Sequence, residues 1–346
     1  MHAQAPDRIA PLLDAYSGRR PDLQPVWFMR QAGRSLPEYR SSRAGTAMLD
    51  ACLTPELAAE ITLQPVRRHG VDAAIFFSDI VVPLKLAGVD VDIVPGRGPV
   101  FARPVRDAAD LDDLLAHDLP DEALAPIEDA VARTVAQLGD VPLIGFAGAP
   151  FTLASYVVEG GPSKDQLRAR TLLHADPLSW ERLTGWLARL SGAFLAAQVR
   201  AGASAVQLFD SWAGALSEAD YRSGALPASR ATLAAVPAGI PAVHFGTGTA
   251  HLLPALRDAG AAVIGVDHRI GLDEASERLG GRVPVQGNID PALLGAPWPV
   301  LERHLEAVVA AGRAAPAHVL NLGHGVPPGT DPGVLTRIVE WAHARP

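Results

Sequence analysis

The stretch Ala205-Val-Gln-Leu-Phe-Asp-Ser-Trp212 contains the pattern on which the fold depends. Five mostly apolar residues, a length typical of a buried strand, run directly into an acidic and a hydroxyl side chain. A long helical pattern over residues 180–201 precedes them. This arrangement is typical of a βα unit, in which a buried parallel strand ends in a polar loop.

The same alternation recurs along the whole chain. Short runs rich in Val, Ile, Phe and Leu end in Gly, Ser, Asp or Asn, and longer helical patterns separate them. The predicted strands are residues 25–29, 73–77, 142–146, 205–209, 242–245, 263–266, 283–286 and 319–322. The predicted helices include residues 54–69, 120–138, 180–201, 250–259, 301–311 and 332–343. Two of these helices open with a capping residue before a proline, Thr54-Pro55 and Asp331-Pro332.

Eight strands with intervening helices predict one α/β domain over residues 1–346, a closed (β/α)8 or TIM barrel. An open doubly wound sheet more often has five to seven strands and a glycine fingerprint after the first. No GxGxxG follows residues 25–29, and no Pro/Ser-rich linker divides the chain. The proline-punctuated region 83–119 is expected to form a loop or small hairpin over the barrel mouth.

Composition limits the classes of ligand and the cellular compartment. The formal net charge of −8 offers no overall attraction to nucleic acid or to an anionic membrane, so an anionic ligand needs a local basic cluster. The single cysteine, Cys52, forms no internal disulfide and builds no cysteine-rich metal site. No apolar run reaches the roughly 18 residues of a membrane span, and the N-terminus lacks a signal-peptide core. We expect a cytoplasmic protein without nucleic-acid or membrane partners.

Polar residues follow several of the predicted strands. In (β/α)8 barrels the working groups lie just past the C-terminal ends of the strands. Taken alone, each residue has a simpler explanation, because loop arginines are usually solvated and an Asp after a strand often caps the next helix. Their shared position predicts one site at the barrel mouth. The groups concerned are the segment Arg30-Gln31-Ala32-Gly33-Arg34 after the first strand, Asp79 after the second, Tyr156 beyond the third, Ser211 after the fourth and His324 after the eighth.

These residues lie in motifs that resemble the uroporphyrinogen decarboxylase family. Residues 25–34, Pro-Val-Trp-Phe-Met-Arg-Gln-Ala-Gly-Arg, followed by Leu-Pro-Glu-Tyr-Arg at 36–40, are similar to its N-terminal signature. Residues 145–156, Gly-Phe-Ala-Gly-Ala-Pro-Phe-Thr-Leu-Ala-Ser-Tyr, resemble its second signature. Further matches at 77–80, 209–214, 286–291 and 321–325 follow in the same order, so the resemblance spans nearly the whole chain.

The resemblance implies an enzyme without a cofactor, and a homodimer. It would convert the four acetates of uroporphyrinogen III to methyl groups, giving coproporphyrinogen III and four CO2. The resemblance also implies that Arg30, Arg34, Asp79, Tyr156, Ser211 and His324 contact this tetrapyrrole substrate, with residues 30–34 as one binding segment. Two positions depart from the family pattern, since Ser35 replaces a common aromatic residue and Glu274 a frequent Trp.

The chemistry of this substrate suits these residue types. Uroporphyrinogen carries eight carboxylates, and the planar guanidinium of arginine binds carboxylates bidentately. Decarboxylation leaves an electron pair on carbon, and a pyrrole protonated on a ring carbon accepts it without a cofactor. Asp79 would accept the pyrrole N–H groups and stabilise the cation. Arg30 is the candidate proton donor, with His324 or a water held by the arginines as alternatives.

Other functions fit the sequence less well. A zinc-dependent methyltransferase of the same barrel type needs His and Cys ligands, but Cys52 precedes a helix and does not follow a strand. A metal-dependent hydrolase barrel needs an HxH motif after the first strand, and the chain has none. Neither Lys85 nor Lys164 lies at a predicted strand end, which disfavours a Schiff base. A non-catalytic tetrapyrrole carrier would use the same arginines and Asp79 without turnover.

Overall fold

A curled, wholly parallel sheet forms the centre of the protein. The computed structural model describes residues 10–345. The seven strands of the sheet lie in the order β1-β4-β5-β6-β7-β8-β9. Their bounds are β1 Ala74–Ile75, β4 Leu143–Gly148, β5 Ala205–Phe209, β6 Ala242–Phe245, β7 Val263–Gly265, β8 Val285–Ile289 and β9 His318–Leu322. A separate antiparallel hairpin contains β2 Val91–Val94 and β3 Gly98–Phe101.

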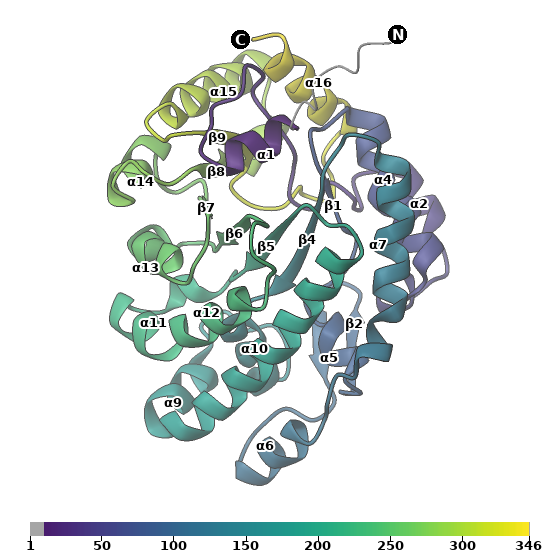
Figure 1. The fold of residues 1–346 in the computed structure, drawn as a ribbon, viewed down its shortest axis with the longest axis vertical. Helices are drawn as coiled ribbons and strands as arrows, with labels where there is room; N and C mark the ends of the chain where they lie inside the picture. Colours follow the sequence, from purple (N-terminus) through teal and green to yellow (C-terminus); the bar gives the residue numbers. More distant parts are fainter. Residues whose placement is uncertain (1–9, 346) are drawn as a thin grey trace.

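Helices surround this sheet, as Figure 1 shows. None of the helices within residues 10–345 combines the length and the apolar character needed to span a bilayer. The α-helices are α1 Pro11–Tyr16, α2 Pro37–Ser42, α3 Met48–Leu53, α4 Pro55–His69, α5 Val82–Leu86, α6 Ala108–Leu115, α7 Ala125–Leu138, α8 Pro150–Glu159, α9 Leu167–Ala175, α10 Pro177–Arg200, α11 Glu218–Gly224, α12 Leu226–Ala234, α13 Leu253–Asp258, α14 Leu272–Arg278, α15 Trp298–Gly312 and α16 Pro332–His343. Short 3-10 turns occupy Asp121–Leu124, Ala213–Ala215, Ala250–Leu252 and Pro291–Gly295.

Seven of the eight predicted strands are confirmed, and the prediction for residues 25–29 is wrong. This segment makes a single bridge, from Val26 to Leu320 of β9. Pro25 has no N–H to donate, and the N–H of Val26 bonds the side chain of Asp72 at 2.8 Å instead of a strand carbonyl. A regular ladder therefore does not form. The observed sheet has seven strands, and residues 25–29 are hydrogen-bonded to β9 on one side and to Asp72, shortly before β1, on the other.

Contacts across the concave face show how strongly the sheet curls. Gln207 of β5 and Gln286 of β8 are three strands apart, a separation of about 14 Å in a flat sheet. Their side chains nevertheless form a hydrogen bond of 2.9 Å. The Trp27 indole donates to the same Gln286 amide, and the Gln207 amide contacts the sulfur of Met29. Residues 25–29 thus present side chains to the interior of the curled sheet.

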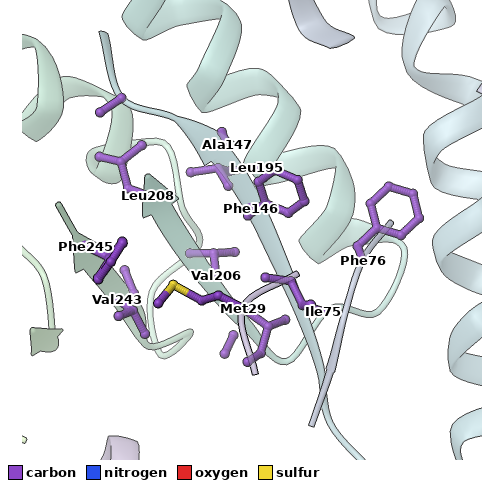
Figure 2. Close-up of a cluster of buried hydrophobic side chains, with 14 of the residues drawn as sticks. Met29, Ile75, Phe76, Phe146, Ala147, Leu195, Val206, Leu208, Val243 and Phe245 are labelled. Atoms are coloured by element: carbon purple, nitrogen blue, oxygen red, sulfur yellow. The ribbon is translucent and has the colours of Figure 1, made fainter. Parts of the chain in front are cut away.

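Buried apolar side chains fill the space around the strands. Figure 2 shows Met29 among side chains of the central strands, with Ile75 and Val243 close by. Leu195 of α10 packs beside Phe146 in the same view. The aromatic rings of Phe146 and Phe209 meet edge-on at 5.4 Å between centroids. This packed interior is the expected core of a curled parallel sheet and leaves the polar chemistry to its ends.

The helix predictions agree with the structure except at some ends. Residues 332–343 are helical, and Asp331 caps this helix by accepting the N–H of Gly333 at 2.9 Å. The helix predicted at 54–69 begins at Pro55, but the Thr54 hydroxyl donates to the Asp50 carbonyl instead of capping. Two predicted helices, at 120–138 and 250–259, begin with a 3-10 turn.

The region 83–119 contains more structure than a loop. The predicted hairpin exists as β2 and β3, between the short helices α5 and α6. Phe101 at the end of β3 donates its N–H to the Gly160 carbonyl, which directly follows α8. The hairpin therefore packs against the helix that carries Tyr156.

A buried histidine makes stability depend on pH. His318 donates through Nε2 to the Gly287 carbonyl at 2.6 Å, and its Nδ1 has no partner among the described residues. Burial lowers its pKa to about 4. Because the unfolded chain then binds the proton more tightly, stability is full above about pH 6.5 and is lost as pH falls toward 4.

We expect the unfolding free energy to fall by about 2 kcal/mol between pH 7 and pH 5 through His318 alone. Thermal melts of wild type and His318→Gln across this range measure it, and the variant should lose less stability on acidification. His174→Gln, on an exposed histidine, is the matched control. Equal slopes for all three proteins would contradict the prediction.

Candidate active site

The predicted polar residues gather at the carboxyl edge of the sheet. All seven strands run parallel, so the loops that follow them emerge at one edge. Asp79 comes four residues after β1, Ser211 two residues after β5 and His324 two residues after β9. Arg30 follows the segment that bonds to β9. The sequence-based expectation of a common mouth is consistent with this topology.

Local backbone geometry fixes the position of Arg30. Its φ is +60°, an uncommon value for a residue with a side chain, and such strain persists only where the surroundings impose it. The Gln31 side chain imposes it here: its oxygen accepts the Phe28 N–H at 3.0 Å and its nitrogen donates to the Ala73 carbonyl at 3.0 Å. A Cβ on Gly33 would approach the Arg30 carbonyl oxygen to 2.9 Å. Gln31 and Gly33 therefore shape the turn that presents Arg30.

The loop after β9 supports the Arg30 side chain. The N–H of Val326 donates to the Met29 carbonyl at 2.8 Å. A Cβ on Gly325 would collide with Cδ and Cγ of Arg30. The aliphatic part of the Arg30 side chain thus packs directly against Gly325. A larger residue at this position, beside His324, would displace it.

Asp79 is a half-buried carboxylate close to Arg30. One of its oxygens accepts the Val81 N–H at 3.1 Å, just before α5 begins, so part of the helix-cap explanation holds. Burial raises its pKa above the ordinary value, while the Val81 bond and the Arg30 charge oppose that rise. Burial therefore disfavours the ionised form of Asp79, and the nearby Arg30 charge favours it.

Tyr156 lies on α8 beside these two groups. Its ring stacks on Trp212 at 4.0 Å between centroids. Burial and the nearby Asp79 charge raise its pKa to about 12, and Arg30 acts in the opposite direction. Its phenol is therefore a hydrogen-bond donor at neutral pH.

The side chain of His324 is exposed, but its surroundings disfavour the charged imidazole. Partial desolvation by its neighbours, with the Arg30 charge second, lowers its pKa below the ordinary value. The imidazole is therefore neutral at pH 7 in the absence of an anion. A carboxylate bound between His324 and Arg30 would reverse this effect.

The remaining predicted residues lie in different settings. Gln31 is fully buried, its side chain is occupied at both ends, and its backbone N–H donates to the Phe28 carbonyl at 3.0 Å. Ala32 and Gly33 are half-buried, and Arg34 is exposed. Ser211 is half-buried, and its carbonyl accepts the Thr247 hydroxyl at 2.6 Å.

Sequence reasoning missed residues that hold the mouth together. The buried Thr152 hydroxyl of α8 donates to Asp210 at 2.8 Å and accepts the Trp212 N–H at 3.3 Å. This link ties the helix of Tyr156 to the loop of Ser211. Arg269, in the loop after β7, lies close enough to His324 to lower its pKa. Its position after a strand was the available signal, as for the other mouth residues.

The departures from the family pattern and the lone cysteine have clear settings. Ser35 is buried, and its hydroxyl has no partner among the described residues. Glu274 lies on α14 and pairs with Arg278 one turn later at 2.6 Å. Cys52 is fully buried in α3, and burial raises the pKa of its thiol, which disfavours the thiolate that a metal would need.

The fold and the site define an α/β protein with a curled parallel sheet and an arginine–carboxylate site at its carboxyl edge. The family model described as uroporphyrinogen decarboxylase (URO-D) matches residues 8–345. Among curated relatives, the uroporphyrinogen decarboxylase of Arthrobacter sp. (strain FB24) is 66% identical over 336 residues, 97% of each chain. That of Leifsonia xyli subsp. xyli is 63% identical, covering 96% of this chain and 93% of the relative. The chain belongs to the uroporphyrinogen decarboxylase family, whose members are carboxy-lyases.

A solved structure supports the fold. The methyltransferase from Methanosarcina mazei superposes with a TM-score of 0.77, covering 96% of this chain and 97% of that one. The two sequences are 18% identical, so the likeness concerns the fold alone.

Proposed function

We propose that this chain removes the carboxyl groups from the four acetate side chains of uroporphyrinogen III, yielding coproporphyrinogen III and four CO2 in porphyrin biosynthesis. In this proposal the substrate contacts the segment of residues 30–34 together with Asp79, Tyr156, Ser211 and His324. Family membership supports the reaction. The residues of the mouth support the assignment of roles.

One observation carries the assignment. The Arg30 charge shifts the pKa of Asp79, Tyr156 and His324, so a single guanidinium lies near all three groups. Arginine stays charged at any working pH and binds carboxylates in a planar, bidentate manner. A substrate acetate held by Arg30 would therefore lie beside a carboxylate, a phenol donor and a neutral imidazole.

The reaction needs two protonations, one deprotonation and one stabilised cation. A proton adds to a pyrrole ring carbon, the bond between the acetate CH2 and its carboxylate breaks, and its electrons neutralise the ring cation as CO2 leaves. A second proton then adds to the exposed CH2, and the ring carbon releases the first, so each cycle consumes one proton. Asp79 accepts the pyrrole N–H groups and stabilises the cation electrostatically.

Arg30 is the proposed donor, with His324 or a water held by the arginines as the alternatives. Arginine is a very weak acid, so its guanidinium gives up a proton with difficulty. A water molecule bound and polarised by Arg30 could donate the proton from nearly the same place without deprotonating the guanidinium. His324 is neutral without substrate and donates only after an anion raises its pKa. Measuring the pH profile of the His324→Gln variant separates these choices.

No cofactor takes part in the proposed mechanism, because the pyrrole is its own electron sink. Incubation of the purified protein with uroporphyrinogen under reducing, anaerobic conditions tests the reaction, with products separated by carboxylate number. We expect coproporphyrinogen to accumulate at the same rate after exhaustive chelation. Activity that disappeared with the chelator and returned with zinc would overturn the mechanism.

Arg34 provides a second carboxylate partner in the proposal. We expect Arg34→Ala to raise the substrate KM several-fold and to change the salt dependence of binding, because an exposed cation is lost. Initial-rate measurements at two ionic strengths check this. Arg303→Ala, on the exposed side of α15, controls for net charge. Unchanged affinity in the folded Arg34 variant would remove this residue from the site.

The proposal includes a closed barrel, a homodimer and a cytoplasmic location. Residues 25–29 take the place of the eighth strand of the barrel, an assignment supported by their hydrogen bonds to Leu320 on one edge and to Asp72 on the other.

Sedimentation analysis of the purified protein tests the dimer. A monomer at assay concentration with full activity would contradict it.

A further inference from the structure

A pocket of about 630 Å³ opens beside the candidate active site. Its walls come from the segment between α8 and α9, from the start of α9 and from the loops after β5, β6 and β7. Ser211 and Trp212 line it, and Trp212 stacks on Tyr156 of the site already described. The pocket is therefore a lateral extension of that site.

Three cationic side chains line this pocket. They are Lys164 and Arg170 from one part of the chain and Arg269 from the loop after β7, and Asp165 is the single carboxylate in the lining. Lys164 is one of only two lysines in the chain. In a protein of net charge −8, three cations around one hollow form the kind of local basic cluster that an anionic ligand requires.

Arg170 has an unused donor at this wall. Its Nε is buried and has no hydrogen-bond partner among the described residues. A buried guanidinium N–H without an acceptor carries a desolvation cost, which a carboxylate in the pocket would remove once the side chain turned toward it. The preceding Gln166 has a φ of +47°, and its side chain donates back to the Ser163 carbonyl at 2.7 Å. The backbone that presents Lys164 and Arg170 is thus held in a defined shape.

Arg269 connects the pocket with the reacting centre. It pairs with Asp267, whose side chain is 1% exposed and also accepts the Gly248 N–H. Its charge lowers the pKa of His324, so Arg269 lies near one residue of the candidate active site as well as in the pocket lining. A ligand that extends from Arg30 past Ser211 would therefore enter a pocket that Arg269 lines.

The geometry points to a carboxylate subsite formed by Lys164, Arg170 and Arg269 for the propionate side chains of the tetrapyrrole. This inference rests on the proposed function and extends it. The four propionates are unchanged in every decarboxylation step, whereas the acetates disappear one by one. A subsite that holds each intermediate in turn must therefore bind propionates, because only these remain available throughout.

The charges of the subsite act on binding and not on bond breaking in this scheme. Uniform binding of substrate and transition state lowers KM and leaves kcat unchanged. Removing Lys164 and Arg170 should therefore weaken the binding of substrate, intermediates and product alike. Arg269 is left intact because its removal would leave the buried Asp267 without its partner.

The test is the double variant Lys164→Gln/Arg170→Gln, with Arg168→Gln as matched control on the exposed side of α9 and outside the pocket. We expect a rise of at least ten-fold in KM for uroporphyrinogen, with kcat within two-fold of wild type. The Kd of coproporphyrin, a tetrapropionate measured by its fluorescence without turnover, should rise by a similar factor. The control should behave as wild type.

Two outcomes would overturn the subsite, and a third would overturn the proposed function while supporting the subsite. Wild-type KM and Kd in a folded double variant would overturn the subsite. A loss of kcat with unchanged KM would also overturn it, because the cations would then act in the chemistry. Wild type without decarboxylase activity, but with coproporphyrin binding that the double variant loses, would overturn the proposed function and support the subsite.

Discussion

Asp79→Asn is expected to keep the fold and to lose two to three decades of kcat. The swap preserves the shape of the side chain but deletes the charge that stabilises the cationic pyrrole. Loss of one preorganised electrostatic partner costs about 3 to 4 kcal/mol in the transition state. Asparagine still accepts a hydrogen bond, so substrate affinity should fall less than kcat does. Single-turnover and steady-state rates measure both quantities.

The pKa of Asp79 predicts how its variant differs in stability and in pH dependence. A folded pKa raised by burial means that ionisation of Asp79 works against folding as pH rises through that value. Asp79→Asn should therefore melt at the wild-type temperature or above it at pH 7. The wild-type rate should fall on the acid side at a higher pH than an ordinary carboxylate would give, because the ionised form is required. The variant should lack this limb.

A matched control distinguishes a catalytic charge from a helix cap. Asp331 caps α16 through the Gly333 N–H and lies outside the mouth, so Asp331→Asn should change neither rate nor stability appreciably. Near-normal turnover in Asp79→Asn would mean that Asp79 only supports the start of α5. The stabilisation of the cation would then belong to another group.

Arg30→Gln is expected to have the second large effect, a loss of at least a hundred-fold in kcat/KM. The variant loses a bidentate carboxylate contact and the cation nearest to Asp79, Tyr156 and His324. Charge-assisted hydrogen bonds contribute about 1.5 to 3 kcal/mol each, and Arg30 offers two to one carboxylate. Initial rates at low substrate concentration measure the loss.

A titration without substrate checks the structural basis of this prediction. Arg30 lowers the pKa of His324, so that pKa should rise in Arg30→Gln when the imidazole protons are followed by NMR. Gly325→Ala should act in the same direction on catalysis, because its methyl group would displace the Arg30 stem. Arg278→Gln removes a similar cation from the outer helix α14 and serves as control. An unchanged His324 pKa in Arg30→Gln would show that the two groups do not interact.

The strands and the places of the site residues could be predicted from sequence because both depend on local patterns. A run such as 205–209 is too apolar for the surface and too short for a helix, and the polar residues that follow it must lie at the strand end. The family motifs at 25–34 and 145–156 gave the residue types and, through them, the reaction. These conclusions needed no knowledge of which segments touch.

Tertiary contacts decided what local pattern leaves open. Residues 25–29 read as a strand, yet the Asp72 side chain takes the N–H that a ladder would use. Gln31 belongs to a ligand-binding motif, yet its amide is used to hold the Arg30 turn against Ala73. In both cases the deciding partner is more than 40 residues away in the chain, so no spacing rule could reveal it.

The charge state of His324 and the cations of the pocket were likewise set by the folded structure. The sequence predicts His324 as a substrate contact and an alternative proton donor, but partial desolvation and the Arg30 charge lower its pKa and leave it neutral without substrate. Lys164 and Arg170 lie close together in the chain, but Arg269 lies about 100 residues away, and only the folded chain places the three around one pocket. Local sequence thus determined which segments are buried and which carry chemistry. Long-range packing determined the environment of each ionisable group, because a pKa depends on the charges and the solvent around it.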